Sequence, residues 1–183
     1  MGYLYYMKNN ILKILAGVVF LIILYFLIFK TNSEEKPFNQ IQFTGNNHIY
    51  NEKLPTYYDT ILNVAMSEVG LTGYHVVISE LSEEAKKQND GELLAHVRYD
   101  EEFYIFIKDF GRTEAIDVIS HEVIHMLQYS SGNLSYSKGN ITWMGEVMPL
   151  NSKDYEQRPW EIEAYKKQSQ LAGKVKESLW GDK

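Results

Sequence analysis

The chain has 183 residues, 45% of them hydrophobic and 14% aromatic, which suits one packed domain with a further segment attached. It has no cysteine, which excludes disulfides, thiolate metal sites and a cysteine nucleophile. The net charge is −6; residues 1–36 hold four of the 18 basic and two of the 24 acidic residues, so residues 37–183 carry 14 basic and 22 acidic residues, or −8. This acidic balance argues against a nucleic-acid partner, because phosphate binding needs a basic surface.

Residues 11–29 form an apolar run in which Lys13 is the only charged side chain. As a helix the run would extend about 28 Å, close to the hydrocarbon thickness of a bilayer, so we expect a transmembrane anchor preceded by a flank over residues 1–10. A slight lysine bias favours a cytoplasmic N-terminus and a domain on the extracytoplasmic side. The alternatives are a buried core helix or a cleaved signal peptide, which would make the protein secreted; however, the run is long for a signal and no A-x-A site follows.

Residues 30–51 are polar and are interpreted as a tether and domain entry, with one short strand over residues 41–43. Residues 52–183 are interpreted as the folded domain. Within it, apolar side chains at helical spacing predict a helix over residues 54–69, and a β-rich run predicts a strand over residues 74–79.

Two strand-like runs, residues 92–99 and 103–108, flank three acidic residues and predict an antiparallel hairpin. The second run is apolar on both faces, which suits an interior strand, whereas the first is better placed at an edge. Further along, the composition predicts a loop over residues 130–140, a small hairpin over residues 141–148 and a last helix that starts at Pro159.

An H-E-x-x-H motif lies in a predicted helix over residues 113–130, for which Thr113 is the expected N-cap. His121 and His125 are four residues apart, so both imidazoles lie on one helix face and can close on one zinc ion. Glu122 follows the first histidine, where its carboxylate can hold and deprotonate a water molecule at the metal. The alternative is a helix face with two unrelated histidines.

A catalytic zinc site needs a third protein ligand, and the candidates are Glu161 and Glu163 on the last helix. If Pro159 occupies the first helical position, Glu161 is the third residue, where its carboxylate can turn back to the start of the helix. Glu163 has no such role. It lies beside the apolar stripe of Trp160 and Ala164, where an inward carboxylate needs a partner. Glu163 is therefore the favoured zinc ligand and Glu161 the alternative.

The run Ile-Asp-Val-Ile-Ser-His-Glu at residues 116–122, followed by a helix that contains Glu163 and Ala164, resembles the gluzincin metallopeptidases. The resemblance covers about residues 92–170 and is closest to minimal, single-domain members. It implies an α+β fold: a small zincin-like domain with a short, mostly antiparallel sheet packed against the H-E-x-x-H helix and a C-terminal ligand helix. The N-terminal transmembrane helix would be added to that domain.

The resemblance also implies hydrolysis of peptide bonds by zinc-activated water, with Glu122 as the general base. A peptide or protein substrate would pair with the exposed strand near residues 94–96 by strand addition. Tyr155 is similar in placement to a gluzincin tyrosine that stabilises the oxyanion, and His96 and Arg98 are alternatives. A packing or loop role is the other interpretation of Tyr155.

Many gluzincins carry an aspartate four residues after the ligand glutamate, where it orients a histidine, whereas this chain has Lys167 at that position. We expect Asp117, one turn before His121, to orient that ring instead. A simple interaction with the helix dipole is the alternative for Asp117.

A second function class shares the expected zinc ligands His121, His125 and Glu163. It is a catalytically silent, membrane-tethered protein that keeps the fold and binds metal in a regulatory or binding role. Such a protein has no need of a general base, so the presence of Glu122 favours the enzyme.

Overall fold

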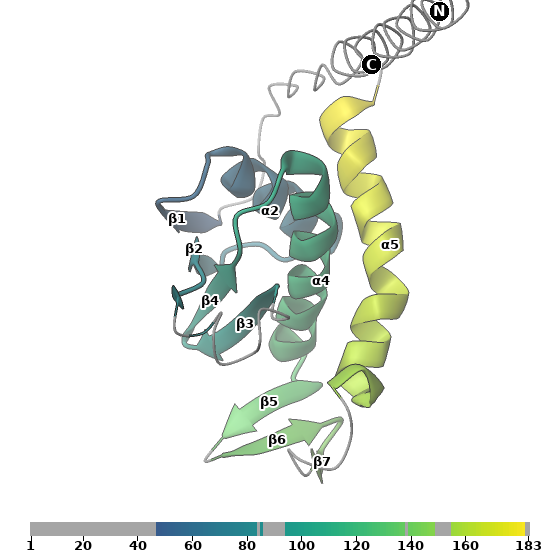
Figure 1. Ribbon diagram of the computed structural model, residues 1–183. Coiled ribbons are helices and arrows are strands. Elements are labelled where there is room, and N and C mark those ends of the chain that lie inside the picture. Colours follow the sequence, from purple (N-terminus) through teal and green to yellow (C-terminus); the bar gives the residue numbers. More distant parts are fainter. Residues whose placement is uncertain (1–46, 84, 86–93, 138, 149–154, 182–183) are drawn as a thin grey trace, which may run out of the picture. The chain divides into compact units, whose positions relative to one another are not determined.

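The computed structural model describes residues 47–83, 85, 94–137, 139–148 and 155–181 (Figure 1). All of these residues belong to the second of the chain's two compact units, Met1–Phe38 and Asn39–Lys183. The expected membrane anchor, its flank and the short strand before residue 47 lie outside the described residues. Within the described ranges, no helix combines the length and apolar character that a membrane crossing requires.

The described residues form an α+β fold, as the sequence predicts. In chain order, the elements are β1 (His48–Glu52), α2 (Tyr57–Glu68), β2 (His75–Glu80), β3 (Ala95–Asp100), β4 (Glu102–Ile107), α4 (Arg112–Ser130), β5 (Leu134–Ser137), β6 (Asn140–Trp143), β7 (Glu146–Met148), the 3-10 turn η1 (Tyr155–Gln157) and α5 (Pro159–Trp180).

The main sheet is mixed, with the strand order β1-β2-β4-β3 (Figure 1). β1 pairs with β2, and β2 with β4, in parallel, and only β3 and β4 are antiparallel. The expectation of a mostly antiparallel sheet is therefore wrong for this layer. The reason is α2, which carries the chain back between β1 and β2, as parallel strands require. The predicted hairpin is confirmed: β4 lies inside the sheet and β3 at its edge.

A second, three-stranded antiparallel sheet has the order β5-β6-β7. The predicted hairpin between β6 and β7 is confirmed, and its turn residues Met144 and Gly145 have φ of 49° and 86°, as a tight hairpin turn requires. The predicted loop over residues 130–140 is wrong, because β5 pairs with β6 there. Of the four residues of β5 only Leu134 is buried, so pairing with β6, and not an apolar pattern, makes this strand.

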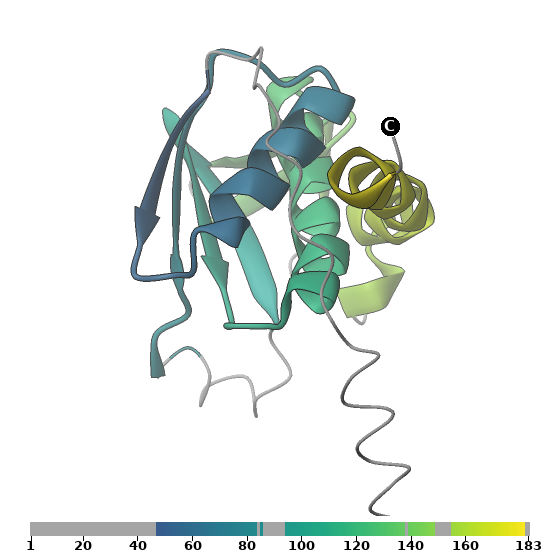
Figure 2. The same ribbon diagram turned by 90° about the horizontal axis from the view of Figure 1, so that it is seen from above.

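α4 is the central helix of the domain. It contacts β3, α2 and α5, and with α2 it covers one face of the main sheet (Figure 2). Its inward face is an apolar stripe at helical spacing, in which Ile116, Ile119, Val123 and Met126 are fully buried; each such side chain contributes about 1.5–3 kcal/mol. The helix starts after Gly111, not after the expected Thr113.

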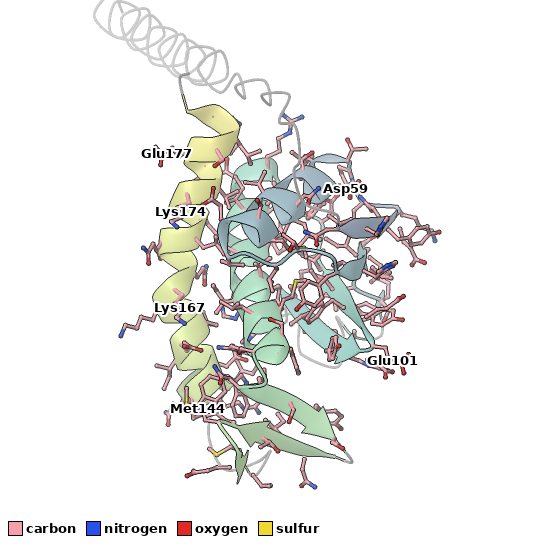
Figure 3. All side chains as sticks on the ribbon, turned by 180° about the vertical axis from the view of Figure 1, so that it is seen from behind. Asp59, Glu101, Met144, Lys167, Lys174 and Glu177 are labelled. Carbon is pink, nitrogen blue, oxygen red and sulfur yellow. The ribbon has the colours of Figure 1, made fainter. Side chains whose placement is uncertain are left out.

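α5 begins at Pro159, as predicted, and runs alongside α4 (Figure 1). Its inner face buries Leu171, Val175 and Leu179, whereas the labelled Lys167 and Glu177 project from its outer side (Figure 3). This apolar face packs α5 against α4 and α2.

Candidate metal centre

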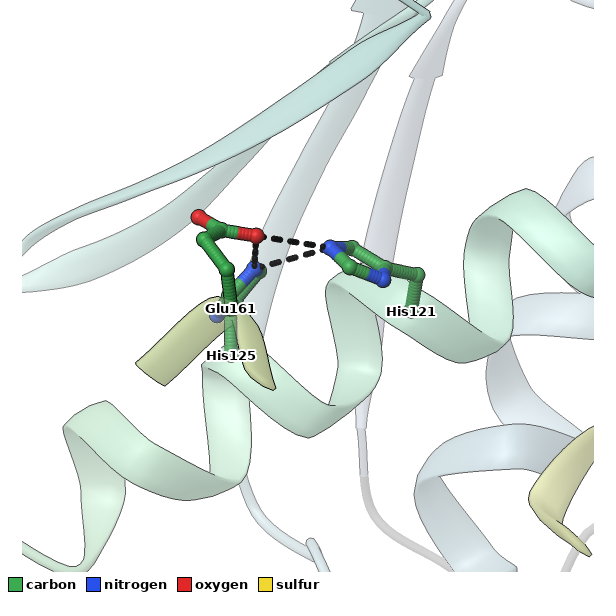
Figure 4. A group of neighbouring side chains, drawn as sticks. All are labelled: His121, His125 and Glu161. Carbon is green, nitrogen blue, oxygen red and sulfur yellow. Dashed lines mark hydrogen bonds and ion pairs between the residues drawn. The ribbon is translucent and has the colours of Figure 1, made fainter. Parts of the chain in front are cut away.

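Three buried side chains from α4 and α5 converge on one point (Figure 4). Glu161 Oε2 lies 3.1 Å from His121 Nε2 and 3.2 Å from His125 Nε2, and the two imidazole nitrogens are 3.0 Å apart. Donors held about 2.0–2.1 Å from a tetrahedral zinc ion lie about 3.3 Å from one another. The observed separations are close to this value, so the three atoms could bind a single ion together.

The chemistry of the donor set fits a metal ion as well as the distances do. Two imidazole nitrogens and one carboxylate oxygen form the ligand set of catalytic zinc sites, and the same set holds iron(II) in some oxygenases. Among the residues that the structure describes, His121, His125 and Glu161 are the group of three that could hold a metal ion. The predicted pair of histidines is thus brought together on one face of α4.

Glu161, and not the favoured Glu163, completes this group, so the expected third residue must be corrected. The capping role assigned to Glu161 is absent, because the backbone N–H of Arg158 donates to the carbonyl of Tyr155 at 3.2 Å. Its carboxylate is therefore free to face α4. Glu163 lies about 200° further round the helix, where its two oxygens accept hydrogen bonds from Lys167 at 2.7 Å and from Gln128 at 2.9 Å.

Two glutamines hold the far sides of the imidazole rings. Nδ1 of His121 lies 3.1 Å from Oε1 of Gln168, and Nδ1 of His125 lies 2.7 Å from Oε1 of Gln128. Neither glutamine was predicted from the sequence, which led us to expect Asp117 in this role. That expectation is wrong, because Asp117 pairs with Lys176 at 2.8 Å.

A sequence signal for the two glutamines does exist, although it is weak. Gln128 follows His125 by three residues, and Gln168 follows Glu161 by seven, so each lies on the same helix face as the residue it follows. Helical spacing of this kind becomes informative only once it is known that Glu161 is the glutamate that faces α4.

Glu122 is 3% exposed, and its Oε2 has no hydrogen-bond partner among the described residues. The backbone of Val97 on β3 hydrogen-bonds to this carboxylate. Burial raises the pKa of Glu122, and the nearby histidines oppose that rise only in part. A buried carboxylate oxygen without a partner is costly, so this position indicates a group held ready for a proton or a ligand.

The electrostatics of Glu161 and His125 are coupled. Burial alone would raise the pKa of Glu161, but hydrogen bonds from His121, His125 and Tyr155 outweigh it and lower the pKa to about 2. Burial alone would lower the pKa of His125, but its hydrogen bond to Glu161 and the charge of Glu122 outweigh that and raise the pKa. The ionised carboxylate of Glu161 therefore favours a proton on His125 or a cation beside it.

Of the expected oxyanion donors, only Tyr155 lies at this group. Its hydroxyl hydrogen-bonds to Glu161, burial raises its pKa, and the guanidinium of Arg158 lies 5.1 Å from its ring centre. His96 stacks at 4.9 Å on Phe106, its partner across the strands, on the sheet face opposite to the helices, because its neighbours along β3, Ala95 and Val97, point to the helix side. Arg98 pairs with Asp100 at 2.9 Å on the surface.

Comparison of the chain with protein-family models, with curated proteins and with solved structures found no match. The interpretation of the site therefore rests on the residues themselves. They supply three donors that could hold a metal ion, a buried carboxylate beside them on the same helix, and a tyrosine hydroxyl at Glu161.

Proposed function

We propose that this protein is a zinc-dependent metallopeptidase of the gluzincin type, tethered to a membrane by residues 11–29 with its domain on the extracytoplasmic side. The observation that carries the enzymatic part is the convergence of His121 Nε2, His125 Nε2 and Glu161 Oε2 within 3.2 Å of one another, with the unpartnered carboxylate oxygen of Glu122 on the same helix. The apolar run of the sequence supports the tether.

Zinc bound by these three side chains would supply a Lewis acid that polarises the scissile carbonyl. Glu122 takes a proton from the attacking water and passes it to the leaving amine. Its raised pKa suits this double role, because a general base whose pKa lies closer to neutrality both accepts and returns the proton efficiently. Tyr155, whose hydroxyl lies at Glu161, is the proposed hydrogen-bond donor to the oxyanion.

The edge strand β3 is the proposed binding place for the substrate backbone. The strand order of the main sheet ends at β3, so an extended peptide could add to it as a further strand. The hydrogen bond between Val97 and Glu122 brings the general base to this strand. A peptide paired with β3 would therefore place its backbone carbonyls beside Glu122.

Two rival functions would give different results. A catalytically silent metal-binding protein would bind metal without turnover, and an iron(II) oxygenase would bind iron in place of zinc. The test is elemental analysis of the full chain in detergent, followed by incubation with a peptide library and mass spectrometry of the products. We expect about one zinc per chain and cleavage products that are absent with Glu122→Gln. Zinc without cleavage by the wild-type chain would contradict the peptidase, and iron in place of zinc would contradict the hydrolytic metal site.

A further inference from the structure

We propose that Gln128 is a positioning residue that selects Glu161 over Glu163 as the glutamate presented to the histidines and also fixes which nitrogen of His125 faces the metal. This inference rests on the metal site of the proposed function, but not on peptidase activity. Gln128 is 2% exposed. Its single side chain contacts His125, the first turn of α5 and Glu163.

The amide of Gln128 can be oriented in only one way. Its Nε2 lies 3.0 Å from the carbonyl oxygen of Trp160 and 2.9 Å from Glu163 Oε2. Both of these atoms only accept hydrogen bonds, so the NH₂ end must face them. The carbonyl end of the amide, Oε1, therefore faces His125.

That orientation decides the protonation of His125. Because Oε1 of Gln128 only accepts, Nδ1 of His125 at 2.7 Å must carry the proton and donate it. A neutral imidazole protonated on Nδ1 keeps the lone pair of Nε2 free. The free lone pair is on the nitrogen that points toward His121 and Glu161, which is the arrangement a metal ligand needs.

The same amide fixes the register of α5. A carbonyl oxygen has two lone pairs, so the carbonyl of Trp160 can accept the bond from Gln128 as well as a hydrogen bond within the helix. The bond from Gln128 holds the first turn of α5 against α4. The second N–H of the amide occupies one oxygen of Glu163, and Lys167 occupies the other. Glu163 is thereby held away from the histidines, whereas Glu161, in the same turn, is left to face them.

Gln168 provides the matched control. It also places an amide oxygen against a ligand imidazole, that of His121, at 3.1 Å. Among the described contacts, however, it does not bridge to the first turn of α5 or to Glu163. If Gln128 acts only by holding a ring, the two glutamines should behave alike; if it also selects the glutamate, they should differ.

The experiment compares Gln128→Met, which keeps an unbranched side chain of similar length but removes every polar contact, with Gln168→Met. Zinc affinity of the full chain in detergent is measured by competition with a chelator, and the ring N–H protons of both histidines are followed by NMR. We expect Gln128→Met to lose about 10- to 100-fold in zinc affinity and the protected His125 Nδ1–H signal. Gln168→Met should lose only the Nδ1–H signal of His121, and its zinc affinity should fall less than that of Gln128→Met.

A charge exchange keeps the test decisive if Gln128→Met fails to fold. Gln128→Glu puts a second carboxylate against Glu163 and should weaken zinc binding, whereas Gln128→Glu combined with Glu163→Gln removes that repulsion and should recover part of the affinity. Such non-additivity is expected only of side chains in contact. Affinities within about twofold of wild type in Gln128→Met and Gln128→Glu, with the His125 ring proton unchanged, would overturn the proposal. A wild-type chain that binds zinc but cleaves no peptide would contradict the peptidase alone.

Discussion

Glu161 Oε2 lies 3.1 Å from His121 Nε2, although 40 residues separate the two side chains in the sequence. The contact depends on the packing of α4 against α5, so the site forms only when the two helices are docked. Glu163, two residues further along α5, instead accepts hydrogen bonds from Gln128 and Lys167. The two glutamates are therefore expected to respond differently to substitution.

Removal of the Glu161 carboxylate should abolish most metal binding. In Glu161→Gln the only anionic donor of the three is lost, so zinc affinity should fall by more than the roughly 10- to 100-fold typical of a residue that merely supports a ligand. Glu163→Gln keeps an oxygen toward its neighbours and is the matched control, with little loss expected. Chelator competition measures both variants. The reverse order of effects would return the ligand role to Glu163.

Glu122→Gln should keep the metal and the fold but lose turnover by about 10²-fold or more, as expected when a general base is removed. The amide has the same shape as the carboxylate, and its neutral charge suits the burial that raises the Glu122 pKa. Zinc content and thermal melting of the variant are the controls. Peptide cleavage at the wild-type rate would assign Glu122 another role.

Zinc affinity should fall as the pH drops. A ligand histidine must be neutral to bind metal, and the pKa of His125 is raised above its ordinary value of about 6.5. Protonation therefore competes with the metal once the pH falls through this raised pKa, and already at a pH where an ordinary histidine would be neutral. Glu161 stays ionised throughout, since its pKa is about 2. Chelator competition at a series of pH values checks this, and an affinity independent of pH below neutrality would contradict it.

The far end of α5 should matter for stability. Leu179 is fully buried, so Leu179→Ala should lower the free energy of unfolding of the metal-free protein by about 2–5 kcal/mol. Glu177→Ala, on the outer side of the same helix (Figure 3), is the control and should stay within about 0.5 kcal/mol of wild type. Thermal or denaturant unfolding measures both. Equal melting of the two variants would mean that this end of α5 is not part of the core.

The full chain should fractionate with membranes and resist carbonate extraction, because residues 11–29 are long and apolar enough to span a bilayer. A variant that lacks residues 1–36 should appear in the soluble fraction. Immunoblotting of both fractions is the measurement. If expression of the full chain yields soluble protein with an N-terminus near Glu34, a cleaved signal would be favoured.

Local patterns in the sequence were sufficient for much of the domain. A helix was predicted where α4 lies, with His121 and His125 on one face, and Pro159 marked the start of α5. Strand-like runs on either side of acidic or turn-forming residues predicted the β3–β4 and β6–β7 hairpins. These features depend on residues close together in the chain, where steric preference and periodicity act directly.

The sequence by itself thus determined which helix carries the two histidines and Glu122, because a spacing of four residues sets a common face whatever packs against it. Only the tertiary structure decided between Glu161 and Glu163. That choice depends on two contacts. The N–H of Arg158 donates to the carbonyl of Tyr155 and leaves Glu161 without a capping role, and the amide of Gln128, from another helix, bonds to Trp160 and Glu163. Parallel pairing in the main sheet was decided in the same way, by strands distant in sequence, whose hydrogen bonds leave no periodic trace in the residues themselves. The strand β5 pairs with its neighbour β6, but its mostly exposed residues carry no apolar pattern that would predict a strand.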